Sequence, residues 1–115
     1  MKITGSCREG VLTLRFAGEL DHHCAREALT ALTERIDAFL PRTCVLDLRE
    51  LTFMDSSGIA LILRAEREMQ DLRGSLILQH IPEQPGRVLR AAGIRQPAEL
   101  REGNGKEEYI DEREQ

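Results

Sequence analysis

The sequence predicts an α/β fold, with a four- to five-stranded mixed sheet and helices packed on it. Three observations lead to this prediction. Short apolar runs alternate along the chain with longer segments whose apolar residues recur every three or four positions. The segments between the runs are long enough for strand–helix–strand crossovers, which make neighbouring strands parallel. The chain has 115 residues, enough for one hydrophobic core, so we expect a single domain over residues 1–100.

The first two elements are predicted to be strands joined by a tight turn. Residues 11–17 form an apolar run rich in strand-forming side chains, and residues 9–10 before them favour a turn. Residues 2–8 are therefore the expected antiparallel partner. Residues 18–21 are expected to end the second strand, and Asp21 is the expected N-cap of the helix that follows.

A first helix is expected between Asp21 and Pro41, because proline disfavours a helical residue before it. Its apolar residues fall on one face at helical spacing. They are Ala25, Ala28, Leu29, Leu32, Ile36 and Phe39. The apolar run at residues 44–48 then suits a strand that is buried on both faces.

The spacing becomes helical again after residues 51–54. A second helix is expected with Gly58 in its first turn and Gly74 just past its end. Its inward stripe comprises Ile62, Ala65, Met69 and Leu72. Residues 75–79 give another strand, and residues 82–93 give a shorter third helix with Pro85 in its first turn. The inward residues of this helix are expected to be Val88, Leu89 and Ala92.

Composition and charge narrow the classes of function. No apolar run approaches the roughly 20 residues that cross a bilayer, so we expect no membrane contact and a cytoplasmic location. One Tyr, no Trp and no basic stripe argue against direct nucleic-acid binding. The three cysteines are widely spaced and are expected to stay reduced as small core or boundary residues.

The last part of the chain is acidic. Residues 99–115 carry a balance of −4, which is the net charge of the whole chain. We expect residues 101–115 to form a disordered, solvated tail. An acidic docking element for a basic partner is the second interpretation of this segment.

Asp21, Asp55 and Ser56 are predicted to share one rim of the sheet. Each aspartate follows a predicted parallel strand, and the carboxyl ends of parallel strands meet at one edge, where sites gather. Ser56 and Ser57 begin the second helix, whose N-terminus favours negative charge. A serine at this place either caps the helix or is a phosphorylation switch.

Other chemistries at the rim have weaker support. A hydrolase nucleophile elbow needs glycine two residues on each side of the serine, and neither Ser56 nor Ser57 has this. His22, His23 and His80 could supply a base by position, but a small domain offers little pocket volume to exclude water. Asp21-His22-His23 is the only candidate metal cluster, and no phosphate-binding loop is present. We therefore expect no enzyme activity, no metal and no cofactor.

Phosphorylation suits the rim better. It would add about −1.5 to −2 charges at Ser56 or Ser57, and the helix N-terminus would offset part of their cost to folding. A partner bound at the rim would lose affinity strongly through like-charge repulsion. The second helix starts with an apolar run, so either Ile59 or Leu61 is expected near the surface as an anchor for such a partner.

Two separated motifs resemble those of a known family. Val45-Leu46-Asp47-Leu48 followed by Phe53-Met54-Asp55-Ser56-Ser57-Gly58-Ile59 closely resembles the core motif of STAS domains. Gly18-Glu19-Leu20-Asp21-His22-His23 is similar to the other hallmark of one branch, the anti-sigma-factor antagonists of the sporulation and stress type. The resemblance covers roughly residues 5–95.

The resemblance implies a STAS fold and a non-enzymatic regulator. The unphosphorylated family member binds an anti-sigma factor, which is also a serine kinase of the GHKL type, and so releases a sigma factor for transcription. The kinase phosphorylates the first serine after the aspartate, here Ser56, and a PP2C-type phosphatase reverses this. Partner-binding positions of the family match Asp21, Asp55, Ser57, Gly58 and Ile59.

The chain departs from the family after the third helix. Residues 94–100 lack the apolar stretch that usually leads to a last strand, and Pro85-Gly86 is an unusual pair for the third helix. The alternative function is a STAS scaffold subunit of a lipid-transport or stress-signalling complex.

Overall fold

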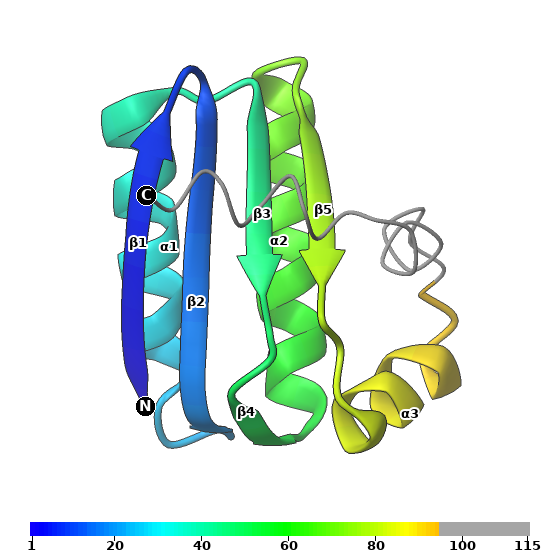
Figure 1. Ribbon diagram of the computed structural model, residues 1–115. Coiled ribbons are helices and arrows are strands. Elements are labelled where there is room, and N and C mark those ends of the chain that lie inside the picture. The colour runs from blue at the N-terminus through cyan, green and yellow to red at the C-terminus, as the bar shows by residue number, and fades with distance from the viewer. Residues whose placement is uncertain (95–115) are drawn as a thin grey trace.

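The computed structural model describes residues 1–94, which form five strands and three helices (Figure 1). In chain order they are β1 (Lys2–Arg8), β2 (Val11–Leu20), α1 (Ala25–Phe39), β3 (Thr43–Asp47), β4 (Leu51–Met54), α2 (Ser56–Asp71), β5 (Ser75–Gln79) and α3 (Glu83–Ala91). The predicted order is confirmed, with β4 added as a separate short strand. The predictions for residues 95–115, including the last strand and the acidic tail, lie outside the described residues.

The strands form one mixed sheet around β2. Its order is β1-β2-β3-β5, and β4 pairs with the end of β2 beyond β3. The β1–β2 pair is antiparallel and the other pairs are parallel. The predicted α/β fold with a mixed sheet is confirmed. Because β2 contacts three other strands, its end is fixed by the body of the sheet, and the rim is built on this end.

β2 is longer than the sequence predicted. Residues 18–20 continue the strand and pair with β4, and the register shifts between Gly18 and Glu19. Gly18 has φ +114, a conformation that L side chains rarely adopt. The expected end of the strand is therefore a bend within it, because the glycine redirects the chain and the pairing with β4 then carries it on to Leu20.

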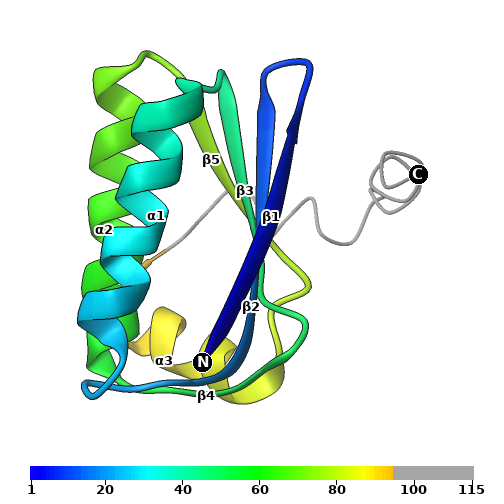
Figure 2. The ribbon, with the colours of Figure 1, turned by 90° about the vertical axis from the view of Figure 1, so that its left-hand side faces the viewer.

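Both long helices lie on the same face of the sheet, side by side (Figure 2). Alternate residues of the strands face them, such as Leu12, Leu14 and Phe16 of β2, which are almost fully buried. Opposite them, α1 and α2 bury most of the expected stripes, whereas Ala25, Leu29 and Leu72 are half-buried. The buried hydrophobic residues of these two helices are Ala28, Leu32, Ile36, Leu61, Ile62, Ala65 and Met69. α3 lies at the lower end of the sheet and contacts β4.

Two of the predicted inward residues are exposed. Phe39 is 53% exposed, because it is the last residue of α1 and the chain turns at Leu40 into the left-handed region. Ala92 is exposed because α3 ends at Ala91, so Ala92 is its C-cap and not part of its packed face. In both cases the residue lies at the very end of its helix, where the packed face gives out.

β3 is buried on both faces, as predicted. Cys44 and Leu46 face the helices, whereas Val45 and Asp47 point to the other face and are 1% and 4% exposed. The side chain of Asp47 pairs with Arg15 of β2 at 3.4 Å.

The three cysteines are free, and Cys44 is buried while Cys7 and Cys24 are half-buried. Burial raises the pKa of the Cys44 thiol to about 12, so it stays protonated and packs as a small apolar group.

Candidate functional site

Asp55 is the N-cap of α2. Its Oδ1 accepts a hydrogen bond from the backbone N–H of Ser57 at 2.8 Å, and its own backbone is extended. The N–H of Gly58 donates to the Asp55 carbonyl at 2.9 Å. The capping is done by the aspartate, so neither serine is needed for it. Ser56, the first residue of α2, is exposed, and Ser57 is half-buried.

The strand before this cap is held on both edges. On one side β2 pairs with β4, and the N–H of Asp55 donates to the carbonyl of Leu20 at 3.2 Å. On the other side the Gln84 side chain of α3 forms two hydrogen bonds with the backbone of Met54. Gln84 Oε1 accepts from the Met54 N–H, and Gln84 Nε2 donates to the Met54 carbonyl, each at 2.9 Å. This amide takes the place of a neighbouring strand.

Gly58 serves the packing of α2 against β4. A Cβ at this position would lie 2.5 Å from Cγ and 2.9 Å from Sδ of Met54, too close for any side chain without a shift. Gly58 is also buried. The absence of a side chain therefore lets the first turn of α2 sit directly on the end of β4, which fixes where Ser56 lies.

Asp21 organises the second loop of the rim. Its Oδ1 accepts hydrogen bonds from the backbone N–H groups of His23 at 3.0 Å and Cys24 at 3.3 Å. Partial burial works in the opposite direction, but these hydrogen bonds prevail and hold the pKa of Asp21 below its usual value, so the side chain is a carboxylate at neutral pH. Asp21 thus caps a turn that precedes the helix. The N-cap of α1 is Cys24, not Asp21 as predicted, because this turn inserts three residues before the helix starts.

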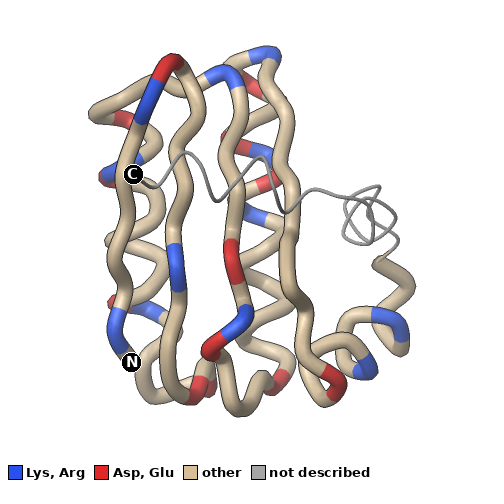
Figure 3. The backbone as a smooth tube through the Cα atoms, viewed as in Figure 1, with Lys and Arg blue, Asp and Glu red and all other residues tan. Residues whose placement is uncertain are grey.

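The two loops meet at the lower rim. Leu20 pairs with Met54 in the sheet, which brings the next residues, Asp21 and Asp55, to the same edge. His22 spans the gap, with its Nδ1 3.9 Å from Oδ2 of Asp55, and its ring stacks on His23 at 4.0 Å. Figure 3 shows acidic residues gathered at this end, where loops lead into the three helices. The rim therefore combines negative charge with an exposed serine hydroxyl.

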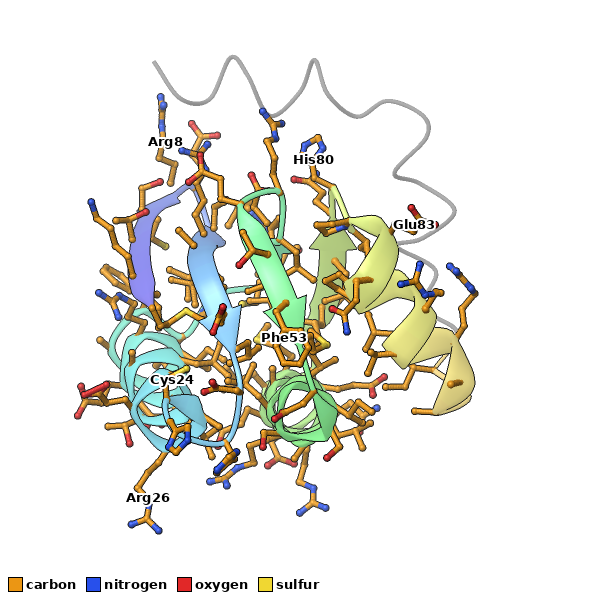
Figure 4. All side chains as sticks on the ribbon, turned by 90° about the horizontal axis from the view of Figure 1, so that it is seen from below. Arg8, Cys24, Arg26, Phe53, His80 and Glu83 are labelled. Carbon is orange, nitrogen blue, oxygen red and sulfur yellow. The ribbon has the colours of Figure 1, made fainter. Side chains whose placement is uncertain are left out.

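The apolar residues near the rim differ from those expected. Leu61 is 3% exposed and belongs to the core, whereas Ile59 is half-buried, so Ile59 is the candidate that remains. The structure adds two residues that the sequence did not single out, Phe53 at 39% and Leu63 at 49% exposure. Figure 4 views this end of the molecule directly and places Phe53 on β4 at its centre.

His80 lies on the far side of the sheet from Cys24 (Figure 4), where its Nε2 is 2.9 Å from Nη2 of Arg49, so it is no base for either serine. Among the described residues no three His, Cys, Asp or Glu side chains are placed to hold a metal ion. In this part of the chain, no helix has the length and apolar character needed to cross a membrane.

Comparison with known proteins identifies the family. Residues 2–102 match the STAS domain family. The chain belongs to the STAS domains. It is 33% identical over 87 residues to the anti-sigma F factor antagonist of Lysinibacillus sphaericus, covering 76% of this chain and 74% of the relative. The antagonist of Paenibacillus polymyxa is also 33% identical, over 85 residues, covering 74% and 73%.

Solved structures agree with this assignment. The anti-sigma factor antagonist SpoIIAA in its unphosphorylated form has a TM-score of 0.75 and 25% identity, over 98% of this chain and 96% of that one. The phosphorylated form of SpoIIAA, a Bacillus cell fate determinant, has a TM-score of 0.70 and 26% identity, over 99% and 100%. The fold of this chain therefore matches that of a relative both in its unphosphorylated and in its phosphorylated form.

The predicted site residues of this STAS domain occupy one end of the molecule, but they differ in accessibility. Ser56 is exposed, Asp21, Asp55, Ser57 and Ile59 are half-buried, and Gly58 is buried. Gly58 can therefore shape a partner surface only through its backbone and its packing on Met54. Gln84 was missed, because its hydrogen bonds join segments 30 residues apart and no local pattern predicts them.

Proposed function

We propose that this STAS domain is an anti-sigma-factor antagonist that is switched by phosphorylation of Ser56. In the unphosphorylated state it binds an anti-sigma factor that is also a GHKL-type serine kinase, and a sigma factor is released. Phosphorylation of Ser56 ends this interaction, and a PP2C-type phosphatase restores it. The domain acts in the cytoplasm, where transcription takes place, and catalyses no reaction itself.

The observation that carries this proposal is the division of roles at the start of α2. Asp55 caps the helix by accepting from the N–H of Ser57, which leaves Ser56 exposed and free for a kinase. The named relatives, anti-sigma F factor antagonists at 33% identity, supply the class of partner. Asp21, Asp55, Ser57 and Ile59, which lie at the same end of the molecule, form the rest of the proposed contact surface.

Electrostatic energies indicate that phosphorylation of Ser56 would change partner binding far more than it would change folding. A phosphate on Ser56 gains about 0.3–1 kcal/mol from the helix N-terminus, up to ~2 in a partly buried place. The carboxylate of Asp55 next to it opposes this gain, so the net effect on folding is small. At an interface, a like-charge contact costs several kcal/mol, and each 1.4 kcal/mol changes affinity about tenfold. Phosphorylation should therefore abolish binding without unfolding the domain.

The test uses a candidate anti-sigma kinase and ATP, followed by mass spectrometry. We expect wild type to gain one phosphate, Ser56→Ala to gain none, and the matched control Ser57→Ala to gain one. A phosphate that persists in Ser56→Ala and disappears in Ser57→Ala would move the site to Ser57 and refute the assignment.

A second measurement separates the switch from folding. Ser56→Asp should keep the thermal stability of wild type and lose binding to the kinase. If Ser56→Asp binds as tightly as wild type, or if it unfolds, the proposed switch is wrong.

A further inference from the structure

A groove runs between the first halves of α1 and α2, on the face of these helices that points away from the sheet. It has a volume of about 570 Å³, and its apolar lining comes mainly from Leu29 of α1 and from Leu61 and Leu63 of α2. Leu63 is 49% exposed, whereas Leu61, Ile62, Ala65 and Met69 of the same helix are buried. Ser57 lies at one end of the groove, so the groove opens next to the rim.

The charged residues of this groove are all basic. Arg26 of α1 and Arg64 and Arg67 of α2 line it, and no carboxylate belongs to its lining among the described residues. Arg64 pairs with Glu68 at 3.2 Å. Within residues 1–94 no ion pair involves Arg26 or Arg67, and Figure 4 shows Arg26 projecting away from the sheet. A ligand for this groove therefore needs apolar groups flanked by negative charge.

The chain carries a segment of this chemistry. The match to the STAS family ends at residue 102, so residues 103–115 lie beyond the matched range. They start with Gly103-Asn104-Gly105, a sequence typical of linkers. The next residues combine an apolar pair, Tyr109-Ile110, with flanking acids. These acids are Glu107, Glu108, Asp111, Glu112 and Glu114.

The segment is long enough to reach the groove. Ile94 is the last described residue, and the 15 residues from there to Tyr109 span up to about 50 Å when extended. The largest dimension of the molecule is 32 Å. The closure of such a loop costs little more than that of a shorter one. Neither distance nor chain entropy therefore excludes docking within one molecule.

We propose that residues 106–115 dock in the groove between α1 and α2 of the same chain. Tyr109 and Ile110 cover the leucines, and the flanking carboxylates pair with Arg26, Arg64 and Arg67. The docked segment covers the surface that continues from Ser57, so it competes with any partner that extends from the rim along the helices. This inference does not depend on the proposed function, since it concerns contacts within the chain alone.

The full-length protein contains its own probe. Tyr109 is the only tyrosine and there is no tryptophan, so intrinsic fluorescence reports on this segment alone. We expect acrylamide to quench Tyr109 several-fold less efficiently than N-acetyltyrosinamide, independently of protein concentration. High salt should remove part of this protection, because exposed ion pairs are screened.

Charge reversal tests the groove itself. Arg26→Glu combined with Arg67→Glu should shift the docking equilibrium about tenfold toward the undocked state, so that quenching approaches that of the free amino acid. Adding Glu107→Lys and Glu108→Lys to this variant should restore protection. Arg90→Glu on α3, a single charge reversal outside the groove, is the control and should leave quenching unchanged. Circular dichroism checks that each variant is folded.

Three results would overturn the proposal. Full exposure of Tyr109 in wild type means that the segment does not dock. Protection that survives the double arginine reversal places the segment on another surface. Protection that rises with protein concentration means that the groove takes the segment of a second copy.

Discussion

Gln84 is predicted to hold the end of β4, and with it Ser56, in place. Its side-chain amide both accepts from the N–H and donates to the carbonyl of Met54, and Met54 precedes the cap at Asp55. Replacement by alanine removes both hydrogen bonds at once. Glu83→Ala is the matched control, because Glu83 neighbours Gln84 on α3 but is exposed and pairs with Arg87 at the surface.

The expected loss follows from the two hydrogen bonds. Each contributes about 0.5–1.5 kcal/mol net, and a backbone group left unpaired in a buried place costs about 1–3 kcal/mol. These bonds are only partly buried, so water can replace part of them. We expect Gln84→Ala to lower the free energy of unfolding by about 1–2 kcal/mol and Glu83→Ala by less than about 0.5 kcal/mol.

Urea unfolding followed by circular dichroism measures this difference. Gln84→Glu adds a sharper test, because an ionised carboxylate accepts from the Met54 N–H but repels the Met54 carbonyl. Protonation restores the donor, so the deficit of this variant relative to wild type should shrink as the pH falls below the usual glutamate pKa of about 4.3. The proposed phosphorylation of Ser56 should be slower in both Gln84 variants.

Two results would refute this reasoning. Gln84→Ala with wild-type stability would mean that water substitutes for the amide at no cost. A Gln84→Glu deficit that stays constant with pH would mean that the donor to the carbonyl is unimportant.

Three further predictions concern the rim. Gly58→Ala should lower the free energy of unfolding by about 1–2 kcal/mol, because the new Cβ would lie 2.5 Å from the Met54 side chain. This overpacking outweighs the gain in helix propensity from alanine. Thermal unfolding measures the difference. Asp55→Ala should cost about 1 kcal/mol through the lost cap, whereas Asp55→Asn should stay close to wild type in urea unfolding, because asparagine caps equally well. The carboxyl of Asp21 should titrate below its usual 3.8 by NMR. The folded-state pKa of Asp21 lies below its unfolded value, so the Asp21 carboxylate stabilises the fold fully at pH values above the unfolded pKa. This stabilisation is lost as the pH falls through the folded pKa. Asp21→Asn should therefore remove this part of the loss of stability in acid.

The sequence predicted those elements whose residues carry their own periodicity. The stripes Ala28–Leu32–Ile36 and Ile62–Ala65–Met69 are buried as expected, because the hydrophobic spacing alone determines which face of a helix packs. The prediction of where β2 ends was wrong, because pairing with a distant strand and not local spacing decides this boundary. Gly18 favours a turn locally, but pairing with β4, more than 30 residues away, continues the strand. The turn preference of a single residue therefore does not end a strand where a partner strand distant in the sequence supplies the hydrogen bonds.

The same distinction applies to the rim. That Asp21 and Asp55 share one edge follows from parallel topology, so the sequence could predict it. It could not predict that Cys24 would be the N-cap of α1, or that Gln84 would replace a strand beside Met54. Both depend on the path of loops whose side chains find their partners only in the folded chain.

The central position of β2 also determines how damage elsewhere in the protein reaches the rim. Since β2 pairs with β1, β3 and β4, the rim does not form unless the sheet forms, and the two share one cooperative transition. A cavity at Leu14, deep in the core, would therefore leave the affinity of each folded molecule unchanged and reduce only the number of folded molecules. A loss of the proposed partner binding caused by such a substitution would be corrected by raising the amount of protein, whereas one caused by a change at Ser56 would not.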